Sequence, residues 1–299
     1  MKLEEAIKDF LVECEIRRYT PKTLRGYRTN LNVFRRVCEE ELGAADTEGI
    51  SVATVRQFTQ VMVRCKHKST YINSLLKTAK SFIQYCYEEG YGGFNTKLKT
   101  FKWVREETPV IKAFKPKDVR LMLDNCRGND FMSIRDACVL TMLFETGIRC
   151  WEMCCIRPED VRDEYILIVA GKNHKERVVP ITAPLKKAIM RYDRMKENYF
   201  AYRHMDEFYF LSFHGRQLTN SAVEHIFKRR GEGIEDVRVS PHTARHFFAV
   251  QSLKNGMDLY QLSRQLGHNS IAITSTYLRT LQDEDIVKAG KNRSVLMNM

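Results

Sequence analysis

The 299-residue sequence lacks any uninterrupted apolar run of about 18 residues, the length that a membrane-spanning helix needs. Its opening stretch, MKLEEAIKDFLVECEIRRY, alternates charged and apolar side chains, so no secretory signal peptide is expected. No two cysteines form a CxxC pair, and the nine cysteines are scattered and odd in number. These features favour reduced thiols and a cytoplasmic location.

Acidic residues are scarcer than basic ones, with 37 Asp and Glu against 49 Lys and Arg and a formal net charge of +12. A surplus of this size favours a polyanionic partner, and charge alone leaves both nucleic acid and anionic lipid as candidates. The hydrophobic fraction of 43% and the charged fraction of 29% are typical of a globular protein. The length exceeds what one hydrophobic core usually serves, so two domains are expected.

Residues 1–103 are predicted to be mostly helical because their apolar residues recur at helical spacing. Thr20 and Pro21 are a typical cap and first-turn residue, so a helix should start there. Two further helices are predicted near 52–63 and 70–87. The helix after Pro21 has an apolar face and a basic side. The candidate DNA-binding residues on that side are Lys22, Arg25, Arg28, Arg35 and Arg36.

The helical periodicity is lost around Pro109, so residues 104–112 are predicted to be a linker and residues 113–299 a second domain with a C-terminal tail. Within it, β-branched residues at 165–169 and 177–181 flank a polar turn and predict a β-hairpin. The remainder has helical periodicity. The expected fold class is therefore mainly α with one small β-hairpin.

Four short segments of the second domain carry unusual chemistry. Arg149 closely follows a glycine, and a turn there could direct its guanidinium into a cleft, with Glu152 as a hydrogen-bonding partner. The alternative is a solvated surface ion pair, which is common. Lys172 lies at the junction of the first strand and its turn, and could protonate a leaving alkoxide if a phosphate lay within reach. The alternative for Lys172 is a solvated surface residue.

The third and fourth segments add imidazoles and a phenol. Ser240 and Pro241 predict a helix start. His242 and Arg245 then share one face near the positive end of that helix, which is a good anion site. In the fourth segment, His268 follows a glycine turn and precedes Tyr277 on the next helix. A tyrosine in such a place is often only a packing residue.

A metal site is the competing interpretation of His242 and His246, whose i, i+4 spacing suits zinc. However, Thr243 occupies the position that the glutamate takes in an HExxH motif, and the positive charge of Arg245 would repel a cation. We therefore expect no metal. A group of arginine, lysine and histidine without facing carboxylates suits an anion, and a phosphodiester fits that charge.

Together, these segments resemble the tyrosine recombinase (phage integrase) family. Residues 146–152 match its TGxRxxE box, and residues 171–181 resemble its lysine hairpin. Residues 242–246 match its HxLRH box, with Ala244 in place of the leucine, and residues 266–277 match its LGHxS box and following tyrosine. The likeness covers nearly the whole chain and extends to short Xer-like recombinases. Ala244 and Val250 depart from the pattern at packing positions, so they bear on stability rather than on chemistry.

The resemblance implies a helical, SAM-like core-binding domain followed by an α+β catalytic domain. It implies that Tyr277 attacks DNA and forms a 3′-phosphotyrosine, while Arg149, Arg245 and His268 hold the phosphate oxygens. Lys172 would be the acid that protonates the leaving 5′-oxygen, and His242 the base or orienting partner of the phenol. Glu152 and His246 would support these groups without touching the phosphate.

The resemblance further implies a double-stranded DNA partner and no cofactor. The basic side of the helix after Pro21 would lie along the duplex, and the tail at about 282–299 would pack on a neighbouring protomer in a tetramer on two DNA duplexes. Integration, excision and dimer resolution share this chemistry. Two other functions stay open at this point. One is a DNA-relaxing enzyme like the type IB topoisomerases, and the other is a non-catalytic DNA-binding regulator.

Overall fold

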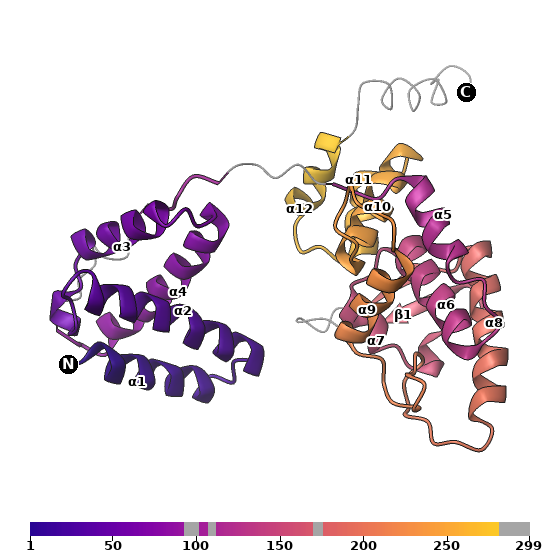
Figure 1. Ribbon diagram of the computed structural model, residues 1–299, viewed down its shortest axis with the longest axis horizontal. Coiled ribbons are helices and arrows are strands. Elements are labelled where there is room, and N and C mark those ends of the chain that lie inside the picture. The colour runs from indigo at the N-terminus through magenta and orange to yellow at the C-terminus, as the bar shows by residue number, and fades with distance from the viewer. Residues whose placement is uncertain (93–101, 107–111, 170–175, 281–299) are drawn as a thin grey trace. The chain divides into compact units, whose positions relative to one another are not determined.

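The computed structural model describes residues 1–92, 102–106, 112–169 and 176–280. The chain divides into two compact units, Met1–Pro109 and Val110–Met299 (Figure 1). The predicted linker at 104–112 contains this boundary, but its limits stay a prediction because residues 107–111 lie outside the described ranges. None of the helices in those ranges has the length and apolar character of a membrane span.

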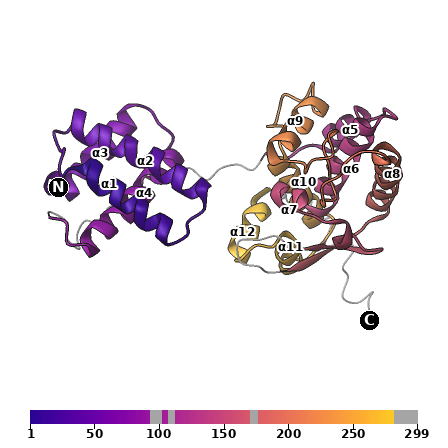
Figure 2. The same ribbon diagram turned by 90° about the horizontal axis from the view of Figure 1, so that it is seen from below.

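The described part of the first unit consists of helices (Figures 1 and 2). They are α1 (Leu3–Ile16), α2 (Pro21–Glu40), α3 (Val52–Arg64) and α4 (Ser69–Glu88), with a short 3-10 helix at Thr47–Gly49. The α2 helix packs against the other three helices. Its Asn30 side chain donates a hydrogen bond of 2.9 Å to the Thr78 hydroxyl of α4.

Local chemistry explains where α2 begins and how it is buried. The Thr20 hydroxyl accepts a hydrogen bond of 3.2 Å from the Thr23 N–H, and Pro21 occupies the first turn, which confirms the predicted helix start. Toward the core, Phe34 of α2 meets Phe58 of α3 edge to face, with ring centroids 5.0 Å apart. The apolar face of α2 therefore holds the bundle together, and its basic side is left toward solvent.

The described part of the second unit is mainly helical with one two-stranded hairpin (Figures 1 and 2). Its longer helices are α5 (Pro116–Asp124), α6 (Phe131–Thr146), α8 (Ala183–Phe200), α9 (Asn220–Arg230), α10 (Pro241–Lys254) and α11 (Leu259–Leu266). Its short elements are α7 (Cys150–Cys154), a 3-10 turn at Pro158–Asp160, β1 (Tyr165–Ile168), β2 (Arg177–Pro180), α12 (Ile271–Ser275) and the 3-10 helix η4 (Thr276–Thr280). The predicted fold class is confirmed.

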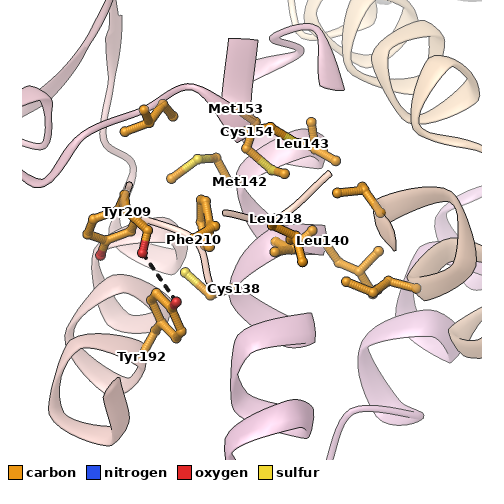
Figure 3. Close-up of a cluster of buried hydrophobic side chains, with 14 of the residues drawn as sticks. Cys138, Leu140, Met142, Leu143, Met153, Cys154, Tyr192, Tyr209, Phe210 and Leu218 are labelled. Carbon is orange, nitrogen blue, oxygen red and sulfur yellow. Dashed lines mark hydrogen bonds between the residues drawn. The ribbon is translucent and has the colours of Figure 1, made fainter. Parts of the chain in front are cut away.

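The α6 helix is the centre of this unit, because it packs against α5, α8, α9 and α10 and is buried along most of its length. Figure 3 shows part of the resulting apolar cluster, with Cys138 of α6 close to Tyr192 and Phe210. The buried hydroxyl of Tyr192 donates to the Tyr209 carbonyl oxygen and accepts from the Leu211 N–H, both at 3.2 Å. Its polar atom is therefore satisfied inside the core.

A buried ion cluster ties α9 to α6. Asp136 of α6 is fully buried and accepts hydrogen bonds from three guanidiniums, those of Arg135 (2.8 Å), Arg229 (2.6 Å) and Arg230 (2.9 Å). Removing the carboxylate would leave several positive charges close together in or near the core. Such an arrangement is costly to break from either side.

The hairpin pairs β1 and β2 antiparallel, with Ile168 opposite Arg177 and Ile166 opposite Val179. The two isoleucines and Val179 are buried, so one face of the hairpin belongs to the core. Both strands lie where the sequence predicts them, and each ends one residue earlier than expected. Lys172 lies outside the described residues.

Gly147 ends α6 in the left-handed region, at φ 63°. A Cβ atom at this position would collide with the ring of Phe248 on α10, so only glycine fits here. The turn brings the segment after α6 close to α10, which positions the residues described below.

We predict that Gly147→Ala destabilises the second unit by roughly 2–5 kcal/mol, from about 1–2 for the left-handed backbone and about 1–3 for overpacking. Gly233→Ala is the matched control, because Gly233 also has a positive φ (87°) but no atom within 4 Å of the added Cβ. The control should lose only the backbone contribution of about 1–2 kcal/mol. Urea unfolding of both variants measures the difference, and equal losses would contradict the proposed collision.

Candidate active site

Arg149 is the first of the predicted residues, and it caps the short helix α7. Its backbone N–H donates to Glu152 Oε2 at 2.8 Å, and its Nη1 donates to Glu152 Oε1 at 2.9 Å. Glu152 is buried, whereas about half of the Arg149 side chain is exposed. The carboxylate therefore holds both the backbone N–H and one guanidinium nitrogen of Arg149, while about half of the side chain stays exposed.

Arg177, the first residue of β2, holds the same carboxylate from another side. Its Nη1 and Nη2 donate to the two oxygens of Glu152 at 3.0 and 2.7 Å, and its Nε donates to the Gln265 carbonyl at 2.8 Å. The Arg177 side chain is largely buried. Glu152 thus accepts two hydrogen bonds from each arginine, and the pairing with Arg177 has the planar, two-pronged geometry that suits a guanidinium.

Arg245 comes from α10, whose predicted start is confirmed by the hydrogen bond from the Thr243 N–H to the hydroxyl of Ser240. The side chain of Arg245 is buried, and it donates to the carbonyl oxygens of Gly147 at 2.8 Å and Leu266 at 2.7 Å. These carbonyls lie at the C-terminal ends of α6 and α11, where helix dipoles favour a cation. The two helix ends therefore fix the guanidinium of Arg245.

The turn after α11 brings His268 to the same place. Gly267 adopts φ 66°, and its carbonyl oxygen accepts a hydrogen bond of 3.2 Å from Arg149 Nη2. The ring of His268 is oriented by a hydrogen bond of 2.8 Å between its Nδ1 and the Thr274 hydroxyl. The Arg149 segment and the His268 segment are therefore joined directly.

Tyr277 lies on η4 and is only 4% exposed. Its hydroxyl is 2.9 Å from Nδ1 of His246, on α10. The ring of His242 packs against that of His246, with centroids 4.2 Å apart. His246 therefore contacts the phenol directly, whereas the sequence suggested His242 for this role. The reason is helical geometry, because His246 lies one turn further along α10 and reaches η4.

The three guanidiniums and one carboxylate of this site leave an excess of positive charge. Burial raises the pKa of Glu152, but Arg177 and Arg149 outweigh it, so the net pKa is lowered and the carboxylate stays ionised. Burial lowers the pKa of Arg245 to about 10, which leaves it protonated at neutral pH. Burial raises the pKa of Tyr277 against the opposing effect of Arg245 and Arg149. The site is suited to a single anion.

His246 and His268 are partly buried and neutral in this setting. Burial, followed by the charge of Arg245 and then that of Arg149, lowers the pKa of His268 to about 4. Burial, then His242 and Arg245, lowers the pKa of His246 to about 4. A neutral imidazole has one ring nitrogen that accepts a hydrogen bond. His246 can therefore accept the phenolic hydrogen of Tyr277.

The structure brings most of the predicted catalytic residues into one region of the second unit. These are Arg149, Glu152, His242, Arg245, His246, His268 and Tyr277. Lys172 and the predicted tail at 282–299 lie outside the described residues. Among the described residues, no group of three or more His, Cys, Asp or Glu side chains is placed to hold a metal ion.

The predicted DNA-contacting residues all lie on α2 of the first unit. Lys22, Arg25, Arg28 and Arg36 are at least partly exposed there. Arg35 differs, because its guanidinium pairs with Glu39 at 2.6 Å. Four of the five cations are therefore open to solvent, and one is partly neutralised within its own helix.

The sequence interpretation missed the importance of Arg177 and Thr274. Side chains along a strand point alternately to its two faces, so Arg177 lies on the same inward face of β2 as the buried Val179, and Val178 lies on the other face. A cation on the inward face of a short strand signals a buried partner, and this signal could have been used. Thr274 gave no comparable signal, because only the turn after Gly267 brings it to His268.

Comparison with protein families identifies both units. Residues 112–284 match the model described as the phage integrase family, and residues 7–90 match the phage integrase N-terminal SAM-like domain. An arginine-rich site beside a tyrosine and this pair of domains define a DNA strand-exchange enzyme of the tyrosine recombinase class. The chain belongs to the phage integrase family.

The relatives agree with this assignment. The chain is 28% identical to tyrosine recombinase XerC of Halalkalibacterium halodurans over 284 residues, which cover 89% of each protein. It is 25% identical to tyrosine recombinase XerD of Listeria monocytogenes over 298 residues, which cover 96% of this chain and 98% of the relative. None of these matches favours a topoisomerase or a non-catalytic regulator.

Solved structures show the same fold. The Tn1549 transposon integrase in complex with transposon right end DNA aligns with a TM-score of 0.77 at 15% identity, over 98% of this chain and 99% of that one. The XerH site-specific recombinase bound to a palindromic difH substrate aligns with a TM-score of 0.72 at 18% identity, over 88% of this chain and 77% of that one.

We predict that the second unit loses stability as the pH falls from about 6.5 toward about 4. In this window the unfolded chain binds protons at His246 and His268, whereas the folded unit holds both in the neutral form. Replacing both by glutamine should reduce the slope of unfolding free energy against pH. Urea unfolding between pH 7 and pH 4 measures that slope.

The control is His225→Gln, which removes an exposed histidine from α9 of the same unit. It should leave the slope close to that of the unaltered protein. Parallel slopes for the double variant and the unaltered protein would show that these two histidines are not held neutral.

Proposed function

We propose that this recombinase cleaves DNA by attack of Tyr277 on a phosphodiester, which forms a 3′-phosphotyrosine and frees a 5′-hydroxyl. The observation that carries the proposal is the hydrogen bond between Tyr277 and His246 in a site with an excess of positive charge. The phosphotyrosyl ester conserves the energy of the bond it replaces, so the step is reversible and needs no nucleotide cofactor.

Arg149 and Arg245 would bind the nonbridging oxygens of the phosphate. Arg245 is fixed by two backbone carbonyls and Arg149 by Glu152, so both guanidiniums are oriented before DNA arrives. Preorganised donors of this kind contribute about 3–4 kcal/mol each to transition-state stabilisation. His268, oriented by Thr274, would add a further hydrogen bond to the same oxygens.

The proton of the phenol would leave through the α10 histidines. His246 holds the phenol of Tyr277 before DNA binds. The ring of His242 packs against that of His246, and we propose His242 as the base or orienting partner. A bound phosphodiester brings negative charge close to Arg149 and Arg245. This charge raises the pKa of His242 and His246 and makes them better proton acceptors. Lys172 is proposed as the acid that protonates the 5′-oxygen.

We extend the proposal to the DNA and to the assembly. The basic side of α2 would bind duplex phosphates, which provides affinity without sequence selection. The chain would work as a tetramer on two duplexes, with residues 282–299 packed on a neighbouring protomer, in the cytoplasm. The DNA partner is supported by structurally similar proteins solved with DNA, among them the Tn1549 integrase and XerH.

We predict that Tyr277→Phe binds its DNA site with unchanged affinity but forms no covalent adduct, because it lacks the nucleophilic oxygen. A nicked suicide substrate carrying the recombination site traps the adduct, which denaturing electrophoresis separates from free protein. Tyr260→Phe is the control, since Tyr260 is an exposed tyrosine on α11. Cleavage by Tyr277→Phe would identify a different nucleophile.

Adduct trapping and a plasmid relaxation assay together separate the alternatives left open by the sequence. A regulator without catalytic activity would form no adduct even in the unaltered protein. A topoisomerase-like enzyme would readily relax a supercoiled plasmid that lacks the recombination site, whereas the proposed recombinase should require the site.

A separate prediction concerns DNA binding by the basic side of α2. Arg25→Gln and Arg28→Gln should each weaken DNA binding and reduce the slope of log affinity against log salt by about 0.9 for each phosphate that is no longer neutralised. Arg35→Gln should have a smaller effect because Glu39 already partly neutralises this arginine. Fluorescence anisotropy over a salt series measures these slopes.

Lys8→Gln is the matched control, because Lys8 is an exposed cation on α1 that is paired with Glu4. It should leave the salt slope unchanged. Equal effects of Lys8→Gln and Arg25→Gln would mean that binding depends on net charge rather than on the α2 face.

A further inference from the structure

Arg177 is the residue that the proposed chemistry leaves unexplained. It is not among the groups proposed to touch the phosphate, yet its side chain is only 14% exposed and all three of its guanidinium nitrogens donate hydrogen bonds. A buried cation is costly unless each donor has a partner. A buried arginine at the edge of an active site with a partner for each of its three nitrogens requires an explanation.

Its partners belong to two of the site's segments. The two terminal nitrogens bind Glu152 in the helix that Arg149 caps, and Nε binds the Gln265 carbonyl in the last turn of α11. Arg177 itself begins the strand that follows the segment containing Lys172. One planar group therefore joins the hairpin, the Arg149 helix and the turn that precedes His268.

The fit beneath that turn is close. A Cβ atom on Gly267 would be 3.0 Å from the guanidinium carbon of Arg177, and glycine is also required there by φ 66°. The carbonyl of Gly267 accepts the hydrogen bond from Arg149 Nη2. Arg177 thus holds the turn at Gln265, and Arg149 holds it at Gly267.

Glu152 connects the two arginines. Its side chain is 2% exposed, and each carboxylate oxygen accepts one hydrogen bond from Arg149 and one from Arg177. If Arg177 no longer held it, the carboxylate would have room to rotate around its remaining partner. The orientation of Arg149 would then be less well defined.

We infer that Arg177 is a positioning residue, which fixes Glu152 and the turn before His268 and thereby holds Arg149 in its phosphate-binding orientation. Lysine cannot replace it, because one ammonium group cannot make three coplanar hydrogen bonds to a carboxylate and a carbonyl. The inference rests on the proposed function, since it assumes that Arg149 binds the phosphate undergoing attack.

The test measures single-turnover cleavage of the suicide substrate by Arg177→Lys. We expect the cleavage rate to fall by about 10- to 100-fold, the usual effect of losing a group that orients a ligand-binding residue. DNA affinity should change by less than about threefold, because the cations of α2 still bind the duplex. Arg157→Lys is the matched control, because Arg157 makes a two-pronged pair with Glu207 (2.8 and 3.1 Å) at the surface of the same unit. It should cleave like the unaltered protein.

A double-variant cycle separates positioning from a general loss of structure. If Arg177 acts through Arg149, the variant with lysine at both positions should be slower than Arg149→Lys by less than about threefold. If the fold-loss in cleavage rate of the double variant equals the product of the two single-variant losses, the inference is overturned. Normal cleavage by Arg177→Lys would overturn it as well. All rates are measured at a temperature at which thermal unfolding curves show the variants folded.

Glu152→Gln serves as the second variant if Arg177→Lys does not fold. The amide can accept hydrogen bonds through one oxygen only, so its rate should fall in a similar way and combine non-additively with Arg149→Lys. Multiplicative defects in this pair would overturn the inference. Failure of the proposed function looks different, because the unaltered protein would then form no Tyr277 adduct.

Discussion

The geometry of the site depends on one buried carboxylate. Glu152 is enclosed by protein and satisfies Arg149 and Arg177 at the same time, through four hydrogen bonds. Each partner comes from a different part of the chain, so the carboxylate is the point at which these parts meet. The cost of burying one negative charge is offset because two guanidiniums, each with fixed geometry, surround it.

The same arrangement makes the site suited to an anion. One carboxylate compensates only part of the charge of Arg149, Arg177 and Arg245, and the neighbouring histidines are kept neutral rather than adding to the excess. An anion of a single charge would restore much of the balance. Because the arginines are held by carbonyls and Glu152 beforehand, little reorganisation is needed when that anion arrives.

Local features of the sequence predicted much of the fold. The caps at Thr20 and Ser240 act on their own helices, so their effect could be recognised without tertiary structure. The strands were predicted to within one residue for the same reason. The motif boxes likewise indicated Arg149, Arg245 and Tyr277, because each of them belongs to a short sequence motif. Contacts between distant segments could not be predicted in this way.

Arg177 and Gln265 are separated by 88 positions, and His246 and Tyr277 by 31. Which histidine reaches the phenol depends on how η4 packs on α10, and neither segment alone contains that information. The interior role of Arg177 was missed because a strand-end arginine is usually solvent-exposed.

The fully buried Asp136, bound by three arginines, has a practical consequence for handling the protein. Concentrated salt screens exposed charges strongly and enclosed charges much less. The proposed contacts between the α2 cations and DNA should therefore be lost at ionic strengths that leave the Asp136 cluster intact. A high-salt wash should strip bound nucleic acid during purification while the second unit stays folded.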